Sequence, residues 1–207
     1  DKWSRNIIGE IIGTKFPEEI VVIGGHIDSW DVGQGAHDDA GGCVAAWEAL
    51  RLLKKMGIMP KRTIRCVLWT NEENGGMGNK AYRDMHLEEL DNHILAIESD
   101  GGVFAPKGFG FTGSEKAKII ASEIHQLMTP IGANHLSDGG RAADTAPLND
   151  LGVPVMSLKV EEEKYFWYHH TEADTFDKVD FKEFNNCVAA MTIMAFIVAD
   201  FPERLPR

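Results

Sequence analysis

The chain has 207 residues, with 21 Lys and Arg against 32 Asp and Glu, and its formal net charge is −11. This length fits one domain, and 43% hydrophobic residues can fill a sizeable core, which excludes a disordered chain. The acidic balance repels phosphate backbones and argues against nucleic-acid binding. The most apolar stretch, 188–198, is too short for a bilayer span, which needs about 20 apolar residues.

The first third of the chain predicts two strands and a helix. Apolar, β-branched runs at 7–12 and 20–25 are separated by a turn-like segment, which predicts an antiparallel hairpin. A helical period then runs over 39–56 and ends at Gly57. The apolar side chains that fall on one face of this helix are Val44, Trp47, Leu50 and Leu53.

Strands and helices alternate in the rest of the chain. The predicted strands are 62–70, 94–99 and 154–160, and the predicted helices are 78–85, 114–128 and 180–200. Ser114 and Asp180 are residue types that cap helix N-termini. This alternation predicts a three-layer α/β/α sandwich around a mixed, mostly parallel sheet.

Acidic side chains and one histidine follow the predicted strands. His26 comes directly after the strand 20–25, with Asp28 two residues on, and Asp38 and Asp39 open the following helix. An acid at Asp39 is typical of a helix N-cap. Two adjacent carboxylates near a histidine also form a concentrated anionic site that a cation would relieve.

The next two strands also run into acids. Glu72 and Glu73 follow the strand 62–70, and Asp100 follows the strand 94–99. Adjacent residues of extended backbone point in opposite directions, so one glutamate can bind a metal while its neighbour moves protons. The alternative for this pair is a solvated acidic loop. Parallel strands place these acids at one edge of the sheet, where open α/β sheets have their sites.

A second source of histidine lies late in the chain. His169 and His170 follow an aromatic run, and Asp174 stands four residues after His170, where it could hold the ring of a ligand. The aromatic neighbours favour a packing role for His169. His37 has no partnered spacing, which favours packing or the surface, although it could also compete for metal or line the entrance of a site.

Four segments together resemble the co-catalytic dizinc exopeptidases, the family that contains bacterial leucyl aminopeptidase and the glutamate carboxypeptidases. They are His26-Ile-Asp-Ser-Trp-Asp-Val-Gly-Gln-Gly-Ala-His-Asp-Asp-Ala-Gly-Gly, Trp69-Thr-Asn-Glu-Glu-Asn-Gly-Gly, Glu98-Ser-Asp and His169-His-Thr-Glu-Ala-Asp-Thr. The resemblance extends over nearly the whole chain. It implies the zinc exopeptidase fold and two Zn²⁺ per chain.

Carried over position by position, the resemblance implies a ligand set. Asp38 would bridge the two zinc ions and be followed by a cis peptide bond. His26 and Asp100 would complete one metal site, and Glu73 and His170 the other. Carboxylate and imidazole ligands without thiolate suit a catalytic zinc pair.

The resemblance also implies the mechanism. Glu72 matches the general base, which would move the proton of a metal-bound hydroxide during peptide hydrolysis. Asp28 matches an acid that orients His26, and Asp174 matches a further supporting acid. The implied enzyme is a hydrolase acting on dipeptides or short peptides, either as an aminopeptidase or as a carboxypeptidase or dipeptidase.

Four residues are candidates for substrate binding. Asp144 stands where the family commonly has an acid beside the substrate, but the loop around it departs from the family pattern. Arg141 could bind a terminal carboxylate or could simply be solvated. Phe166 and Trp167 precede His170 and are expected in a substrate pocket, with a subunit contact as the alternative.

The resemblance sets the remaining expectations. Residues 1–207 should form the C-terminal portion of a catalytic domain, without the family's upstream segment and protease-associated domain. A homodimer and a secreted or lysosomal location are implied, although the chain begins with no signal peptide. The alternatives are a single-zinc acyltransferase of the glutaminyl-cyclase type and a non-enzymatic ectodomain of the same fold.

Overall fold

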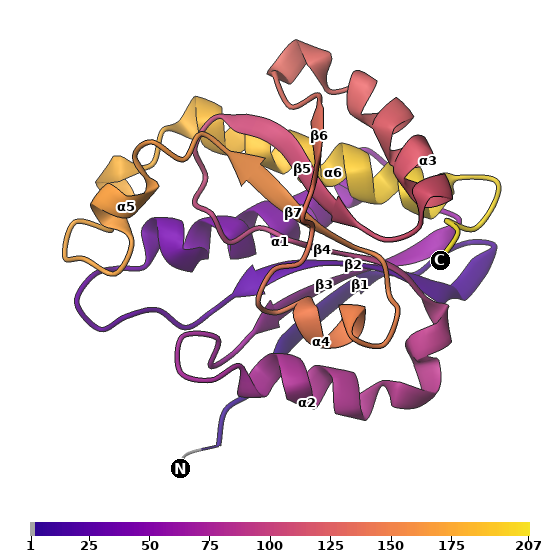
Figure 1. Ribbon diagram of the computed structural model, residues 1–207, viewed down its shortest axis with the longest axis horizontal. Coiled ribbons are helices and arrows are strands. Elements are labelled where there is room, and N and C mark those ends of the chain that lie inside the picture. The colour runs from indigo at the N-terminus through magenta and orange to yellow at the C-terminus, as the bar shows by residue number, and fades with distance from the viewer. Residues whose placement is uncertain (1–2) are drawn as a thin grey trace.

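The computed structural model describes residues 3–207 and contains a seven-stranded sheet with helices on both faces (Figure 1). The strands lie in the order β1-β3-β2-β4-β7-β5-β6. Their bounds are β1 Ile7–Ile11, β2 Phe16–His26, β3 Arg62–Trp69, β4 His93–Glu98, β5 Pro106–Thr112, β6 His135–Asp138 and β7 Val155–Val160. The pairs β1–β3 and β5–β7 are antiparallel and the other pairs are parallel. The predicted mixed, mostly parallel sheet is therefore confirmed.

Helices form the outer two layers of the sandwich. One face of the sheet is covered by α1 (Gly41–Lys55), α3 (Glu115–Gln126) and α6 (Phe181–Asp200), and the other by α2 (Met77–Met85) and α4 (Ala146–Asn149) (Figure 1). The single turn α5 (Tyr165–Tyr168) lies at one end of the molecule. The remaining short turns are Ala36–Ala40, Leu87–Asn92, Thr129–Ile131 and Phe176–Lys178.

The strand β2 shows how the sheet joins two cores. Val21 and Ile23 belong to the cluster shared with α1 and α6, whereas Ile20 and Val22 belong to the cluster that contains Tyr82 of α2. Successive side chains of a strand point to opposite faces, so a run of apolar residues fills both layers. The same run ends at the sheet edge with His26.

The helix α6 begins and packs as its sequence predicts. The carboxylate of Asp180 accepts hydrogen bonds from the backbone N–H groups of Lys182 and Glu183, at 2.8 and 2.9 Å. This helix has the length and apolar composition of a membrane span. Its buried side chains, however, lie in the core against α1 and the sheet, which accounts for its hydropathy.

The predicted hairpin of the first two strands is wrong. β1 pairs with β3, and β2 lies on the other side of β3. The ion pair between Arg65 Nε and Glu10 Oε1, 2.5 Å apart, joins β1 to β3 at a position where these two residues face each other. An apolar run indicates that a strand exists, but it does not specify its neighbour.

The buried face of α1 agrees with the expected one only in part, because Leu50 and Leu53 are buried but Val44 and Trp47 are not. Val44 and Trp47 are 44% and 55% exposed, whereas Ala46 and Ala49 are fully buried together with Leu53. Alanine side chains let α6 approach closely, and α1 and α6 make extensive contacts. The helix is therefore rotated so that its small residues, and not its largest one, face the core.

Candidate metal centre and active site

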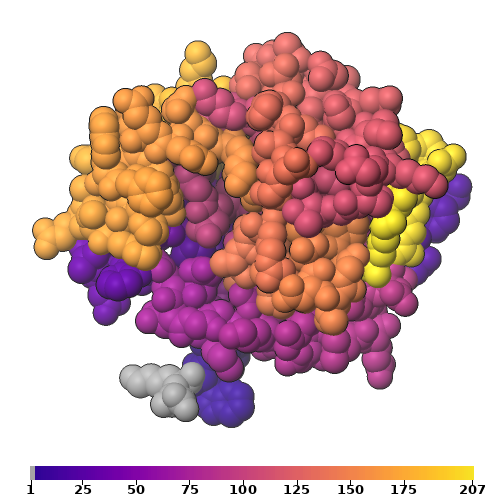
Figure 2. Space-filling view, viewed as in Figure 1, coloured from indigo at the N-terminus to yellow at the C-terminus, as the bar shows by residue number. Residues whose placement is uncertain are grey.

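Three parallel strands bring the candidate residues to one edge of the sheet. β2, β3 and β4 run in the same direction, so their carboxyl ends lie side by side. His26 is the last residue of β2, Glu72 and Glu73 follow β3, and Asp100 follows β4. The surface is hollowed between the yellow-orange segment that carries α5 and the purple segment that follows β3 (Figure 2).

His26 is buried and its ring is held between carboxylates. Its Nδ1 lies 2.8 Å from the backbone carbonyl of Asp28, so Nδ1 donates there and Nε2 faces the neighbouring carboxylates. Nε2 lies 3.1 Å from Asp100 Oδ1 and 3.2 Å from Asp38 Oδ1. Burial lowers the pKa of His26, but hydrogen bonds to Asp100 and Asp38 outweigh it and raise the pKa well above its usual value.

Asp38 stands between two groups of possible ligands. Its Oδ1 faces His26, while its Oδ2 lies 3.3 Å from His170 Nε2. His170 Nε2 is also 2.9 Å from Glu73 Oε2. The peptide bond after Asp38 is cis, as expected from the resemblance. The five predicted ligands are therefore linked by contacts: His26 and His170 face Asp38, Asp100 faces His26, and Glu73 faces His170.

The donor distances fit zinc. Ligands at about 2.0–2.1 Å from a tetrahedral zinc ion stand roughly 3.3 Å from one another. The four donor pairs, at 2.9, 3.1, 3.2 and 3.3 Å, are close to that spacing. Asp38 Oδ2 and Glu73 Oε1 are buried and accept no hydrogen bond from residues 3–207. Unpartnered buried oxygens cost free energy, and a cation would satisfy them.

Asp39 lies beside the same atoms but is already occupied. It could be grouped with His26 and Asp100 as a cation site. Its two carboxylate oxygens, however, accept the backbone N–H groups of His26 and Gly42, each at 3.0 Å. Complete burial, followed by the charge of Asp100, raises the pKa of Asp39. The Asp39 carboxylate therefore links the end of β2 to the start of α1. The bond from Gly42 agrees with the expected N-cap, whereas the bond from His26 was not expected.

Glu72 and Glu73 diverge from the end of β3. The Glu73 carboxylate contacts His170, whereas Glu72 Oε2 lies 4.0 Å from His26 Nε2, and Glu72 belongs to none of the ligand groups found within residues 3–207. The Glu72 side chain is 21% exposed, so it can reach solvent or substrate. Burial raises the pKa of Glu72, against the opposing charge of His26.

Two further acids hold the backbone that carries these side chains. The carboxylate of Asp28 accepts the N–H groups of Glu72 and Glu73, at 3.1 and 3.3 Å. The carboxylate of Asp174 accepts the N–H groups of His37 and Asp38, at 2.7 and 3.1 Å. Both acids were expected to support a histidine ring. In the structure, Asp28 Oδ1 is 3.9 Å from His26 Nδ1, and its carboxylate bonds backbone instead.

The four candidate substrate residues lie outside the ligand group. Asp144 is buried, Asn79 donates a hydrogen bond of 3.0 Å to it, and burial, followed by the charge of Glu98, raises the pKa of Asp144. Arg141 is engaged with Asp150 at 2.5 Å. Phe166 and Trp167, on α5, are 74% and 59% exposed.

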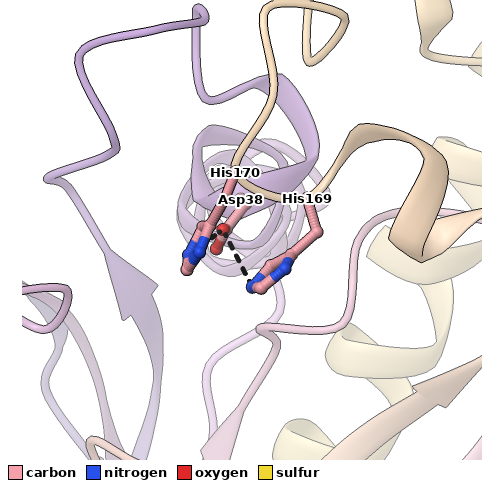
Figure 3. A group of neighbouring side chains, drawn as sticks. All are labelled: Asp38, His169 and His170. Carbon is pink, nitrogen blue, oxygen red and sulfur yellow. Dashed lines mark ion pairs between the residues drawn. The ribbon is translucent and has the colours of Figure 1, made fainter.

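Of three aromatic residues near the centre, one differs from the sequence expectation, one had no expectation and one agrees with an expected alternative. His169 was expected to pack in the core, but its Nε2 lies 3.6 Å from Asp38 Oδ2 and its side chain is 28% exposed (Figure 3). Trp30 had no predicted role, and it contacts both Glu73 and His170. His37 is buried and stacks on Phe104, with ring centroids 4.1 Å apart, so it packs as one alternative predicted.

Comparison with known proteins identifies the family. The model of "Peptidase family M28" matches residues 6–195. The chain belongs to peptidase family M28. Carboxypeptidase Q of Xenopus laevis is 46% identical and that of Homo sapiens 45% identical, both over the whole chain. The chain spans 44% of the length of each of these relatives.

Two solved structures share this fold. The "Peptidase M28 precursor" from Shewanella amazonensis superposes with a TM-score of 0.93 at 34% identity, over 98% of this chain and 46% of that one. A zinc aminopeptidase from Bacillus subtilis superposes with a TM-score of 0.75 at 21% identity, over 97% and 51%. At 21% identity, the similarity to the Bacillus subtilis enzyme supports the fold alone. The predicted peptidase family and the α/β sandwich are thus confirmed.

Proposed function

We propose that this chain carries the centre of a zinc-dependent exopeptidase that hydrolyses dipeptides or short peptides. The observation that carries the proposal is the position of Asp38 between two ligand groups, with Glu72 beside them and outside both. Two Zn²⁺ per chain would be held by the donors His26, Asp38, Asp100, Glu73 and His170. Bound zinc would lower the pKa of coordinated water towards about 7 and polarise a carbonyl oxygen.

The protein's own side chains supply the proton transfers and the geometry. Glu72 would take a proton from the attacking water as the water oxygen bonds to the carbonyl carbon. The same carboxyl would pass that proton to the leaving amine nitrogen as the C–N bond breaks. Asp28 fixes the backbone N–H groups of Glu72 and Glu73, so it sets the separation between the base and its neighbouring ligand.

The two alternative functions require fewer of these residues. A single-zinc acyltransferase of the glutaminyl-cyclase type needs one ligand group, and a non-enzymatic ectodomain needs neither. Asp38 has a histidine on each side, His26 and His170, and Glu72 Oε2 lies 4.0 Å from His26 Nε2. These observations favour the peptidase over either alternative.

The resemblance to the M28 relatives supports the rest of the proposal. We assign residues 1–207 to a catalytic domain that belongs to a longer protein, because the chain spans under half of the carboxypeptidase Q relatives. The names of those relatives favour a carboxypeptidase or dipeptidase, whereas solved neighbours include aminopeptidases. A homodimer and a secreted or lysosomal location complete the proposal.

Zinc analysis combined with a small substrate panel tests this function. Elemental analysis of the purified chain should give two zinc ions. The panel holds a free dipeptide, its N-acetylated form and its C-terminal amide. A dipeptidase needs both free ends, an aminopeptidase cleaves the amide, and a carboxypeptidase cleaves the acetylated form. A zinc-loaded chain that cleaves none of the three, or one that binds a single zinc ion and cyclises N-terminal glutamine, would contradict the proposal.

A further inference from the structure

Trp30 contacts two of the proposed zinc ligands at once. Its Nε1–H donates a hydrogen bond of 2.7 Å to Glu73 Oε2. Its indole ring stacks on the imidazole of His170, with centroids 4.6 Å apart and an angle of 29° between the planes. Glu73 Oε2 is also the oxygen that lies 2.9 Å from His170 Nε2. The indole of Trp30 therefore contacts both Glu73 and His170, the two donors that complete one proposed metal site.

The opposite face of the His170 ring is also covered. The ring of His169 stacks on it with centroids 3.6 Å apart and an angle of 23°. The rings of Trp30 and His169 are both nearly parallel to the His170 ring. At these distances they must lie on opposite faces of it, because on the same face their atoms would overlap. His170 is thus held between Trp30 and His169.

The stack adds to the contacts with Asp38 and Glu73 that orient His170. His170 lies in a loop after α5 with φ of 58°, in the left-handed region, and its side chain is 33% exposed. The ligand His26, by contrast, ends a central strand, is 1% exposed and donates to the Asp28 carbonyl. The backbone and burial therefore fix the orientation of His26 more firmly than that of His170.

We propose that Trp30 is a positioning residue that maintains zinc affinity at the Glu73–His170 half of the centre, an inference that rests on the proposed function. A hydrogen bond to a ligand carboxylate fixes the oxygen that faces the metal, and the loss of such outer contacts typically weakens metal binding about 10- to 100-fold. The half formed by His26 and Asp100 has no contact with the indole among the interactions of residues 3–207. Loss of the indole therefore weakens one zinc site and spares the other.

Chelator-competition titrations of zinc on three variants of the full chain test this inference. Trp30→Phe keeps an aromatic ring and removes the N–H donor, while Trp30→Ala removes both contacts. Trp47→Phe is the matched control, because Trp47 is also about half exposed, at 55% against 49%, and lies on the outer side of α1. The expected result for Trp30→Phe is one zinc ion bound about 10- to 100-fold more weakly and the other within about twofold of wild type. Trp47→Phe should leave both affinities unchanged.

The ¹⁵N indole resonances give a second readout that does not depend on activity. Trp30→Phe identifies the Trp30 signal by its disappearance. In a chain that keeps Trp30, Glu73→Gln should shift the Trp30 signal more than any other indole signal. The substitution changes the group that accepts the hydrogen bond from Trp30 Nε1–H. Wild-type affinity at both sites in Trp30→Phe, or an indole signal unmoved by Glu73→Gln, would overturn the inference. A wild-type chain that binds fewer than two zinc ions would refute the proposed function itself, and the wild-type titration tells the two failures apart.

Discussion

Asp174→Asn tests whether a buried carboxylate fixes the turn that carries Asp38. The Asp174 side chain is 3% exposed and accepts two backbone N–H groups, from His37 at 2.7 Å and from Asp38 at 3.1 Å. Asparagine retains one carbonyl acceptor but turns an NH₂ group towards the second N–H. The substitution therefore loses one charge-assisted bond and leaves one buried donor without a partner.

The expected loss of stability follows from those two bonds. A hydrogen bond to a charged group contributes about 1.5–3 kcal/mol, and an unpaired buried donor costs about 1–3 kcal/mol. These effects overlap, since both count the same N–H group. We expect Asp174→Asn to lower the free energy of unfolding by about 2–4 kcal/mol. We also expect weaker zinc binding, because the Asp38 turn is less well fixed.

Urea unfolding followed by circular dichroism measures the effect, in excess EDTA and again in zinc. Asp177→Asn is the matched control, because this nearby acid is 69% exposed. Its effect should stay within about 0.5 kcal/mol, as for most surface substitutions. The reasoning would be refuted if Asp174→Asn changed the stability no more than the control and zinc affinity stayed at the wild-type value.

Four other substitutions, at Glu72, Glu73, His93 and Phe166, give three independent predictions. Glu72→Gln should keep two zinc ions but lower turnover by roughly 10²- to 10⁴-fold, whereas Glu73→Gln should lose zinc; the reverse pattern in metal analysis and hydrolysis would exchange their roles. Burial lowers the pKa of His93 to about 4, so the unfolded chain binds this proton first as the pH falls. The free energy of unfolding should therefore fall by about 2 kcal/mol between pH 7 and pH 4.5 because of His93. Urea titrations of His93→Gln should lack this loss, and an unchanged pH dependence would contradict it. Phe166→Ala should alter substrate preference and leave the mass from light scattering unchanged; a shift to monomer with the same preference would assign Phe166 to a subunit contact.

The central strands and the ends of helices could be predicted because local chemistry decides them. The run 62–70 is buried on both faces of the sheet as β3, and Ser114 caps α3 through a hydrogen bond of 3.2 Å from Ala117 N. The acids at the strand ends could be assigned to one edge for a similar reason, because parallel strands share that edge. Residue type and strand direction were sufficient there.

Two strands, β5 and β6, were not predicted, and for β5 the reason is that glycine occurs both in turns and where two backbones approach closely. In β5, Gly108 has φ of +141°, and a Cβ atom there would lie 1.8 Å from the carbonyl oxygen of His135 in β6. The glycine is required because the neighbouring backbone approaches so closely. In the sequence alone, the same residue indicates a turn.

The aromatic environment of the site could not be predicted because it depends on contacts between distant segments. Trp30 and His170 come from opposite ends of the chain, and their stacking depends on how the loop after β2 meets the loop after α5. His169 faces Asp38 because the chain turns into the left-handed region at His170. Neither ring orientation is a property of its local sequence.

The bonds from Asp174 also have a consequence for the order in which the molecule folds. They join Asp174 to residues 137 and 136 positions earlier in the chain, and contacts that close such long loops form late because of their entropic cost. During synthesis, His26, Asp38 and Asp100 emerge long before His170. We therefore expect metal capture to complete folding and not to nucleate it, with the β2–β3–β4 amides protected first in pulse-labelled hydrogen exchange, at the same rate with and without zinc.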